Sequence, residues 1–152
     1  MIEIREANLN DLQELVECRM ELLVEAGEGG RERSCEALKA RLEVYFTENL
    51  GKEFFAFVAT HEGKIVGVSG LNIVKKTPTF SNLSGLEGYI MNMYVKKEFR
   101  GHGAATNLIK RLLELLKERE VKRVRLLATE RGSHVYSKLG FKKYRDGMVM
   151  DL

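Results

Sequence analysis

The residues between Val95 and Ala105 have the types and spacing needed to bind an anion. A strand pattern ends at Val95, a turn containing Gly101 and Gly103 follows, and a long helix pattern begins at Ala104. The first N–H groups of a helix have no partner within it and lie at the positive end of the helix dipole, so an anion placed there accepts several hydrogen bonds. The segment therefore predicts a phosphate site. A tight turn that caps a helix explains the same residues equally well when they are taken alone.

Other well-defined ligand motifs are excluded for this turn and its surroundings. It lacks the Gly-x-Gly-x-x-Gly spacing of dinucleotide-binding turns, and it lacks the Gly-Lys-Ser/Thr sequence of nucleotide triphosphate loops. A metal is not expected, because His61, His102 and His134 are far apart and stand in no metal-ligand spacing.

The composition indicates an intracellular protein, which we expect in the cytoplasm with neither a membrane nor a nucleic acid as its partner. The 152 residues carry 25 Lys and Arg against 22 Asp and Glu, a net charge of +3. Basic residues concentrate after Lys96, but acidic residues are interleaved with them, which disfavours nucleic acid. No apolar run approaches the roughly 20 residues that span a bilayer, and residues 1–6 do not form a signal-peptide core. Cys18 and Cys35 are too few for a disulfide framework.

The hydrophobic periodicity predicts one α+β domain over residues 1–152 with a mixed sheet. Asn10, with Gln13 three residues later, is the expected start signal of the first helix, and Gly140 is the expected left-handed cap of the last. A long surface loop is expected over 75–88. Strands are expected at 2–6, 53–60, 64–74, 89–95, 121–128, 141–144 and 148–152, the last two joined by a turn at Asp146-Gly147, and helices at about 12–26, 34–49, 104–120 and 132–139.

Placed in this order of elements, the turn resembles a known signature. Arg100-x-x-Gly103-x-Ala105 closely resembles the Gln/Arg-x-x-Gly-x-Gly/Ala motif of the GNAT superfamily of N-acetyltransferases. Residues 90–95 resemble that family's fourth strand, and residues 135–141 resemble its Leu-Tyr-x-Lys-Leu-Gly-Phe element. The resemblance implies a mostly antiparallel central sheet flanked by helices, with a splayed strand pair that holds CoA.

The resemblance also implies a set of residues that bind acetyl-CoA as a co-substrate. The backbone of Met93, Tyr94 and Val95 would bind the pantetheine arm, with the Met93 N–H donating to the thioester carbonyl and to the oxyanion of a tetrahedral intermediate. The pyrophosphate would lie on the turn, whose residues are Arg100, Gly101, His102, Gly103, Ala104 and Ala105.

Tyr136 occupies the position of the family's usual general acid, which protonates the departing thiolate. A phenol with a pKa of about 10 is a reluctant donor to a thiolate whose conjugate acid has a pKa of about 8.5, so an orienting role or plain core packing is an alternative. The sequence departs from the family twice nearby. Thr129 stands where an Asn often holds the pantetheine, and Gly132 stands where an Ala is frequent. Thr129 is retained as an expected CoA contact.

The general base and the acceptor have the least support in the sequence. A lysine-like amine is only about 0.1% neutral near pH 7.4, so a base or a water relay must take its proton. The expected fourth strand offers Asn92 but no carboxylate, which leaves Glu87 just before it as the candidate base, with a solvated loop carboxylate or a water relay as alternatives. We expect the acceptor pocket among residues 27–33, the 75–88 loop and the fourth strand, where Glu28, Glu32 and Glu87 could attract a cation.

These features together predict an acetyl-CoA-dependent N-acetyltransferase that acts on the primary amine of a small molecule or peptide by direct attack. A catalytically weak acyl-CoA-binding sensor or subunit is the alternative. A homodimer through Met148, Val149 and Met150 is also an option, although burial in the core would explain these apolar residues as well.

Overall fold

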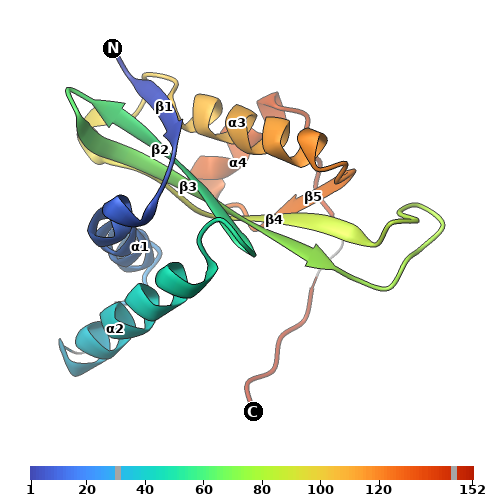
Figure 1. The fold of residues 1–152 in the computed structure, drawn as a ribbon, viewed down its shortest axis with the longest axis horizontal. Coiled ribbons are helices and arrows are strands. Elements are labelled where there is room, and N and C mark those ends of the chain that lie inside the picture. Colours follow the sequence, from blue (N-terminus) through green and yellow to red (C-terminus); the bar gives the residue numbers. More distant parts are fainter. Residues whose placement is uncertain (30–31, 145–146) are drawn as a thin grey trace.

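The computed structural model describes residues 1–29, 32–144 and 147–152, and only the backbone of 32–34. Its centre is one five-stranded sheet in the order β1-β2-β3-β4-β5, in which β1 to β4 pair antiparallel and β4 and β5 pair parallel. Helices α1 and α2 lie on one face of the sheet, and α3 and α4 lie on the other (Figure 1). The predicted α+β fold with a mixed sheet is therefore confirmed. The bounds are β1 Glu3–Glu6, α1 Leu12–Glu25, α2 Glu32–Asn49, β2 Phe54–His61, β3 Lys64–Lys75, β4 Leu86–Val95, α3 Ala104–Glu118, β5 Arg123–Leu126 and α4 Glu130–Lys138.

Two apolar layers, one on each face, hold the sheet in place. On the α3 face, Leu108, Ile109 and Leu112 of α3 are fully buried against strand residues, as the predicted stripe requires. On the opposite face, Phe46 of α2 and Cys18 of α1 pack with the strand side chains that point the other way. Successive strand residues alternate between faces, so a shift of one residue would exchange the two layers. Burial on both sides therefore fixes which side chains of β4 face α1 and α2.

The start of the first helix differs from the prediction. Asn8 caps a 3-10 turn over Leu9–Asp11 and forms a capping box with Asp11, and Asp11, not Asn10, is the N-cap of α1. The side chain of Asn8 accepts from the Asn10 N–H at 2.9 Å, and Asp11 accepts from the Asn8 N–H at 2.9 Å. Asp11 also pairs with Arg5 of β1 at 2.7 Å. This ion pair joins the cap to the sheet, and no local pattern could show it.

The central hairpin is confirmed, and so is the predicted long loop, although it is shorter than predicted. β2 and β3 pair up to His61 and Lys64 around a two-residue turn. β3 continues to Lys75 and β4 begins at Leu86, so the connection covers residues 76–85. The Lys76 N–H donates to the Gly85 carbonyl at 2.8 Å, which closes the base of that connection. The prediction of a loop over 75–88 was wrong at both ends because pairing between β3 and β4 satisfies that backbone.

The C-terminal segment is where the predicted elements fail. Gly140 has a φ of 94° and ends α4 as predicted. The strands predicted at 141–144 and 148–152 are wrong, since neither described part of this segment forms a strand. The segment runs away from the sheet (Figure 1), and an isolated two-stranded hairpin is marginal in water. The predicted turn residue Asp146 lies outside the described residues.

Candidate active site

The turn between β4 and α3 presents open backbone, as the sequence predicts. Gly101 and Gly103 adopt left-handed conformations with φ of 80° and 81°, and a Cβ at either position would meet nothing within 4 Å. No side chain caps α3 at Gly103, and the first amide to bond back to this cap is that of Asn107, at 3.0 Å from the Gly103 carbonyl. The preceding amides of the first turn are therefore available to an anion. Ala104 and Ala105 pack against the apolar layer beneath them.

The side chain of Arg100 is engaged with the protein at the same turn. Its Nε donates to the Val95 carbonyl at 2.7 Å, and an Nη donates to both carboxylate oxygens of Glu25 at 2.8 and 3.0 Å. The guanidinium also lies 5.5 Å from the centre of the Tyr94 ring. Burial raises the pKa of Glu25, but Arg100, and then Lys97, outweigh burial and hold it below its ordinary value. Arg100 thus braces the turn against α1, and the backbone of the turn remains as the candidate anion site.

Two further predicted residues of this region have defined surroundings. The ring Nδ1 of His102 lies 2.8 Å from the Arg100 carbonyl oxygen, and the residue is exposed. Tyr94 is buried on the α1 face, and its hydroxyl lies 3.4 Å from Glu25. Burial, and then the neighbouring carboxylate of Glu21, raise the pKa of Tyr94. Its side chain is therefore part of the core, and only its backbone remains as a candidate contact for a ligand along β4.

The strand that leads into the turn is bulged. Val68 of β3 pairs with Tyr94, and Gly70 pairs with Met91, so the single residue Ser69 faces two residues of β4, Asn92 and Met93. Asn92 adopts a φ of 56°, a left-handed conformation that Asn tolerates better than most residues. A bulge of this kind bends a strand and leaves its extra residue out of the ladder.

β4 also separates from β5 next to this bulge. The parallel pairing runs from Glu87 with Arg123 to Ile90 with Leu126, where β5 ends, while β4 continues to Val95. From Met91 onward, that edge of β4 has no strand partner among the residues described. The main-chain groups around Met93 are thus open on one side, which confirms the bulged and splayed strand pair that the resemblance implied.

Two buried polar side chains lie at the bulge, and the sequence did not predict a binding role for either of them. The Ser69 hydroxyl and the Asn92 side-chain oxygen are buried and have no hydrogen-bond partner within the described part of the chain. Unpaired buried polar atoms are uncommon and require a reason such as ordered water or a ligand. The available signals were single polar residues within apolar stretches, Ser69 after Val68 and Asn92 between Met91 and Met93.

Tyr136 lies in the apolar layer on the α3 face, together with Met93, which packs at its margin. Its ring contacts Phe141 edge to face, with 5.8 Å between the ring centres. A Cβ at Gly132 would come within 3.1 Å of this ring, so the glycine at that position makes room for Tyr136. Burial raises the pKa of the Tyr136 phenol, which therefore stays protonated at neutral pH. Its hydroxyl has no hydrogen-bond partner among the described residues, and it is free to donate.

Thr129 has a structural role at the start of α4. Its Oγ1 accepts from the Gly132 N–H at 3.2 Å and caps the helix. The residue is exposed just beyond the end of β5, and the proton of its hydroxyl remains available to a ligand.

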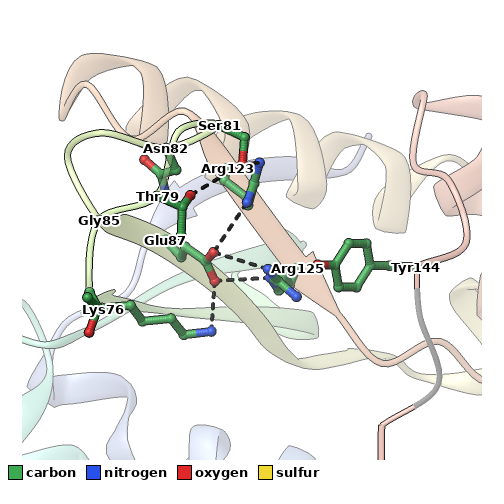
Figure 2. A pocket seen from close by; sticks show the side chains of 10 residues that line it. Lys76, Thr79, Ser81, Asn82, Gly85, Glu87, Arg123, Arg125 and Tyr144 are labelled. Carbon is green, nitrogen blue, oxygen red and sulfur yellow. Dashed lines mark hydrogen bonds and ion pairs between the residues drawn. The ribbon is translucent and has the colours of Figure 1, made fainter.

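Glu87 lies at the other end of β4 from Met93. The two are six residues apart, roughly 15–20 Å along a bulged strand, so the structure does not bring the candidate base to the candidate oxyanion donor. Glu87 is buried and pairs with Lys76 at 2.8 Å and with Arg125 at 3.0 Å (Figure 2). Lys76 first, and then Arg125, hold the pKa of Glu87 below its ordinary value. A low pKa makes Glu87 a weak base.

The remaining parts of the predicted acceptor pocket are only partly described. Glu28 is exposed after α1, whereas Gly30, Arg31 and the side chain of Glu32 lie outside the described residues. Within the described residues, no group of three or more His, Cys, Asp and Glu side chains could hold a metal ion. None of the helices described is long and apolar enough to cross a membrane.

Comparison with known proteins places this geometry among acetyl-transfer enzymes. Residues 16–141 match the model of the acetyltransferase (GNAT) family. A protein described as a predicted acetyltransferase from Clostridium acetobutylicum, crystallised with acetyl-CoA, superposes with a TM-score of 0.90 at 28% identity, over 99% of this chain and 96% of that chain.

Two curated relatives match a shorter stretch. N-alpha-acetyltransferase 30 of Schizosaccharomyces pombe is 30% identical over 94 residues, which are 60% of this chain and 59% of the relative. Glucosamine 6-phosphate N-acetyltransferase of Trypanosoma brucei brucei is 32% identical over 90 residues, 59% of each protein. The matched stretch thus spans less than two thirds of either relative.

Proposed function

The chain belongs to the acetyltransferase (GNAT) family, and on that premise we propose that it is an acetyl-CoA-dependent N-acetyltransferase. Its acceptor is the primary amine of a small molecule or a peptide, in line with relatives named for glucosamine 6-phosphate and for the α-amino group of proteins. One observation carries the proposal. The bulge at Asn92 and Met93, the open edge of β4 and the glycine turn follow one another along residues 92–103.

Successive residues from the bulge to the glycine turn would contact successive parts of acetyl-CoA. The amides that follow Arg100 would bind the pyrophosphate, since the left-handed glycines leave open space in front of them. The open edge of β4 from Met93 to Val95 would pair with the amide groups of the pantetheine arm. The backbone of this chain therefore supplies most of the binding, and bound acetyl-CoA supplies an acyl group activated as a thioester.

Two groups of the chain would act on the reacting atoms. The Met93 N–H would donate to the thioester oxygen as it gains negative charge during direct attack by the amine, and a donor held in place for that charge lowers the barrier. Tyr136 would give its proton to the departing thiolate. Its raised pKa makes this transfer unfavourable in equilibrium terms, so its contribution depends on a position close to the sulfur.

A water relay is the proposed route for the proton of the amine. Glu87 is distant from Met93 and has a lowered pKa, and residues 88–95 contain no carboxylate. The unpaired oxygens of Ser69 and Asn92 at the bulge support a relay, since buried polar atoms without protein partners commonly bind ordered water.

Two measurements test the proposal. Calorimetry should show acetyl-CoA binding at a 1:1 ratio, and a thiol reagent should report CoA release that depends on an added amine. The alternative, an acyl-CoA-binding sensor, is favoured by the lack of a carboxylate on the second half of β4 and predicts binding with no thiol release from any amine. Failure to bind acetyl-CoA would overturn both functions.

We also propose that the protein forms a homodimer through its C-terminal segment. Met148, Val149 and Leu152 are almost fully exposed, which is costly for apolar side chains. β5 ends the sheet among the described strands, and an apolar groove of about 370 Å³ that includes Leu116 and Val124 runs beside it. The segment of a second copy could pair with that edge. Light scattering should give twice the chain mass of 17.3 kDa, and Val149→Glu should give a monomer.

A further inference from the structure

The cavity around Glu87 has an excess of positive charge. It has a volume of about 240 Å³ and lies between the 76–85 connection, β4, β5 and the C-terminal segment. Three cationic side chains, Lys76, Arg123 and Arg125, surround the single carboxylate of Glu87 (Figure 2). The described side chains that line the cavity therefore have a formal charge of +2. Hydroxyl and amide groups from the 76–85 connection form the rest of its wall.

Glu87 uses only part of the hydrogen-bonding capacity of these cations. Both of its oxygens are taken, by Lys76 at 2.8 Å and by Arg125 at 3.0 and 3.2 Å. Arg123 stays 3.9 Å from the carboxylate and donates to the Ser81 hydroxyl at 2.9 Å. Since a guanidinium has five N–H donors and an ammonium has three, Arg123 and Lys76 keep donors that no described group accepts. All three cations remain about a third or more exposed at the cavity.

The cavity also contains a guanidinium whose movement is restricted by a neighbouring aromatic ring. The Tyr144 ring lies 4.3 Å from the Arg125 guanidinium, which restricts that side chain (Figure 2). A restrained guanidinium next to a second one suits carboxylate and phosphate oxygens, which accept paired N–H bonds.

The cavity lies on the same strand as the open edge at Met93, on the face of the sheet that α1 and α2 cover. Glu87, Tyr89 and Met91 are alternate residues of β4, so they share a face, and Met91 packs with the layer under α1 and α2. Arg125 is the register partner of Tyr89, and Arg123 is that of Glu87. Along the bulged strand, Met93 is about 10–13 Å from the level of Arg125 and roughly 15–20 Å from the level of Arg123.

We propose that this cavity binds an anionic group of the acetyl acceptor, a carboxylate or a phosphate that lies about 10–20 Å from its amine. The proposal rests on the proposed function, since it names the acceptor class for that site. In an extended peptide, whose residues span about 3.3–3.6 Å each, such a group belongs to about the fourth to the sixth residue. Glu87 acts as the fixed counter-charge that holds the cations in place, and the surplus of two charges attracts the acceptor.

Peptide acceptors test the inference. The series is one tetrapeptide with a free α-amine and an amidated C-terminus whose fourth residue is Glu, Gln or phosphoserine, and acetylation is followed by the mass gain of one acetyl group. We expect kcat/KM to be at least tenfold higher for the Glu or phosphoserine peptide than for the Gln peptide, and the comparison of the two acidic peptides distinguishes carboxylate from phosphate. In Arg123→Gln the ratio of kcat/KM between the acidic peptide and the Gln peptide should fall to about two. Lys122→Gln, an exposed neighbour that removes the same charge, should retain the wild-type ratio.

If no peptide is acetylated, a binding measurement still tests whether the cavity binds an anion. Inorganic phosphate is titrated into protein saturated with CoA, and backbone amide NMR signals are followed. Shifts at residues 76–87 and 123–125 that disappear in Arg123→Gln and persist in Lys122→Gln support the inference. Equal use of all three peptides, or no shift at these residues, overturns it. Acetyl-CoA binding with no acetylation of any amine, alongside these shifts, would remove the proposed activity and leave the anion site.

Discussion

The two ends of β4 present different chemical groups, main-chain groups at the Val95 end and charged side chains at the Leu86 end. At the Val95 end, the bulge and the glycine turn leave main-chain groups without partners, and the side chains there are buried or braced. At the Leu86 end, the backbone is paired on both sides, and charged side chains fill a cavity. A ligand that every family member shares can be bound by backbone, which does not change with sequence. Recognition of a particular acceptor requires side chains, which do.

The largest expected effect is at the backbone end. Gly103→Val places a β-branched residue at a φ of 81°, where it must twist the turn and misdirect at least two amides. Each charge-assisted hydrogen bond contributes roughly 1.5–3 kcal/mol, so the acetyl-CoA Kd should rise about 100-fold or more by calorimetry. Gly63→Val has a similar φ of 75° in a distant hairpin and is the control. Equal affinity in both variants would contradict the backbone site.

The next effect concerns the one side chain proposed for chemistry at this end. Tyr136→Phe removes the proton donor and keeps the buried ring, so kcat should fall about 100-fold while the KM for acetyl-CoA changes less than threefold. Tyr45→Phe, which removes a hydroxyl that accepts from Asn72 on another face, should leave kcat unchanged. An unchanged kcat in Tyr136→Phe would leave the backbone as the whole catalytic apparatus.

At the side-chain end, Glu87→Gln should lower stability by about 2 kcal/mol, because it leaves three cations around a neutral group and those cations are partly exposed. For a chain of this size, that is roughly 4–8 °C in Tm. The folded pKa of Glu87 lies below 4.5, so its contribution is present above pH 4.5 and is lost as the pH falls through the folded pKa.

Urea unfolding at several pH values measures this contribution. The gap in unfolding free energy between the wild type and Glu87→Gln should be widest near pH 7 and should close below pH 4.5. Glu118→Gln, on the exposed side of α3, should show no gap at either pH. A gap that is independent of pH would mean that packing, and not charge, is what Glu87 provides.

A smaller effect tests the brace between α1 and the turn. Glu25→Gln keeps the shape of the side chain but removes its charge from Arg100, so the turn is held less firmly and the acetyl-CoA Kd should rise about threefold to tenfold. Glu17→Gln, an exposed residue of the same helix, is the matched control. If Glu25→Gln tightens binding instead, Arg100 is a direct ligand that Glu25 holds back.

The smallest effect is expected at Thr129. Thr129→Ala removes the cap of α4 and should cost about 0.5–1 kcal/mol in unfolding free energy. Thr129→Ser, which keeps the cap, should recover most of it. We expect the KM for acetyl-CoA to rise less than threefold, and a tenfold rise that Ser restores would show that the hydroxyl binds CoA as the family resemblance suggested.

The fold was predictable wherever local pattern and burial agree. The α3 stripe at Leu108, Ile109 and Leu112 has a helical period, and the hairpin at His61 and Lys64 has alternation on both sides of a turn, so each element is visible in its own residues. The C-terminal segment alternates too, but a strand exists only against a partner edge. Its pattern could not show that the described chain lacks such a partner.

The glycine turn of the candidate site was predictable from the sequence, whereas the cluster of charged side chains around Glu87 was not. Gly101 and Gly103 are close in sequence, and their function follows from conformational freedom. The bulge came from resemblance, because no residue of 90–95 requires it. The cluster around Glu87 draws Lys76 and Arg123 from segments far apart in the chain, and each looks like a solvated surface charge in the sequence.

The left-handed residue Asn92 divides β4 into two segments of unequal stability. Amides on the Glu87 side take part in ladders with both neighbours, whereas those on the Val95 side have a neighbour on one side only. Hydrogen exchange should therefore be slow before Asn92 and faster after it in the free protein. A pantetheine arm in that position would complete the sheet as an added strand, and acetyl-CoA should slow exchange in the second segment alone.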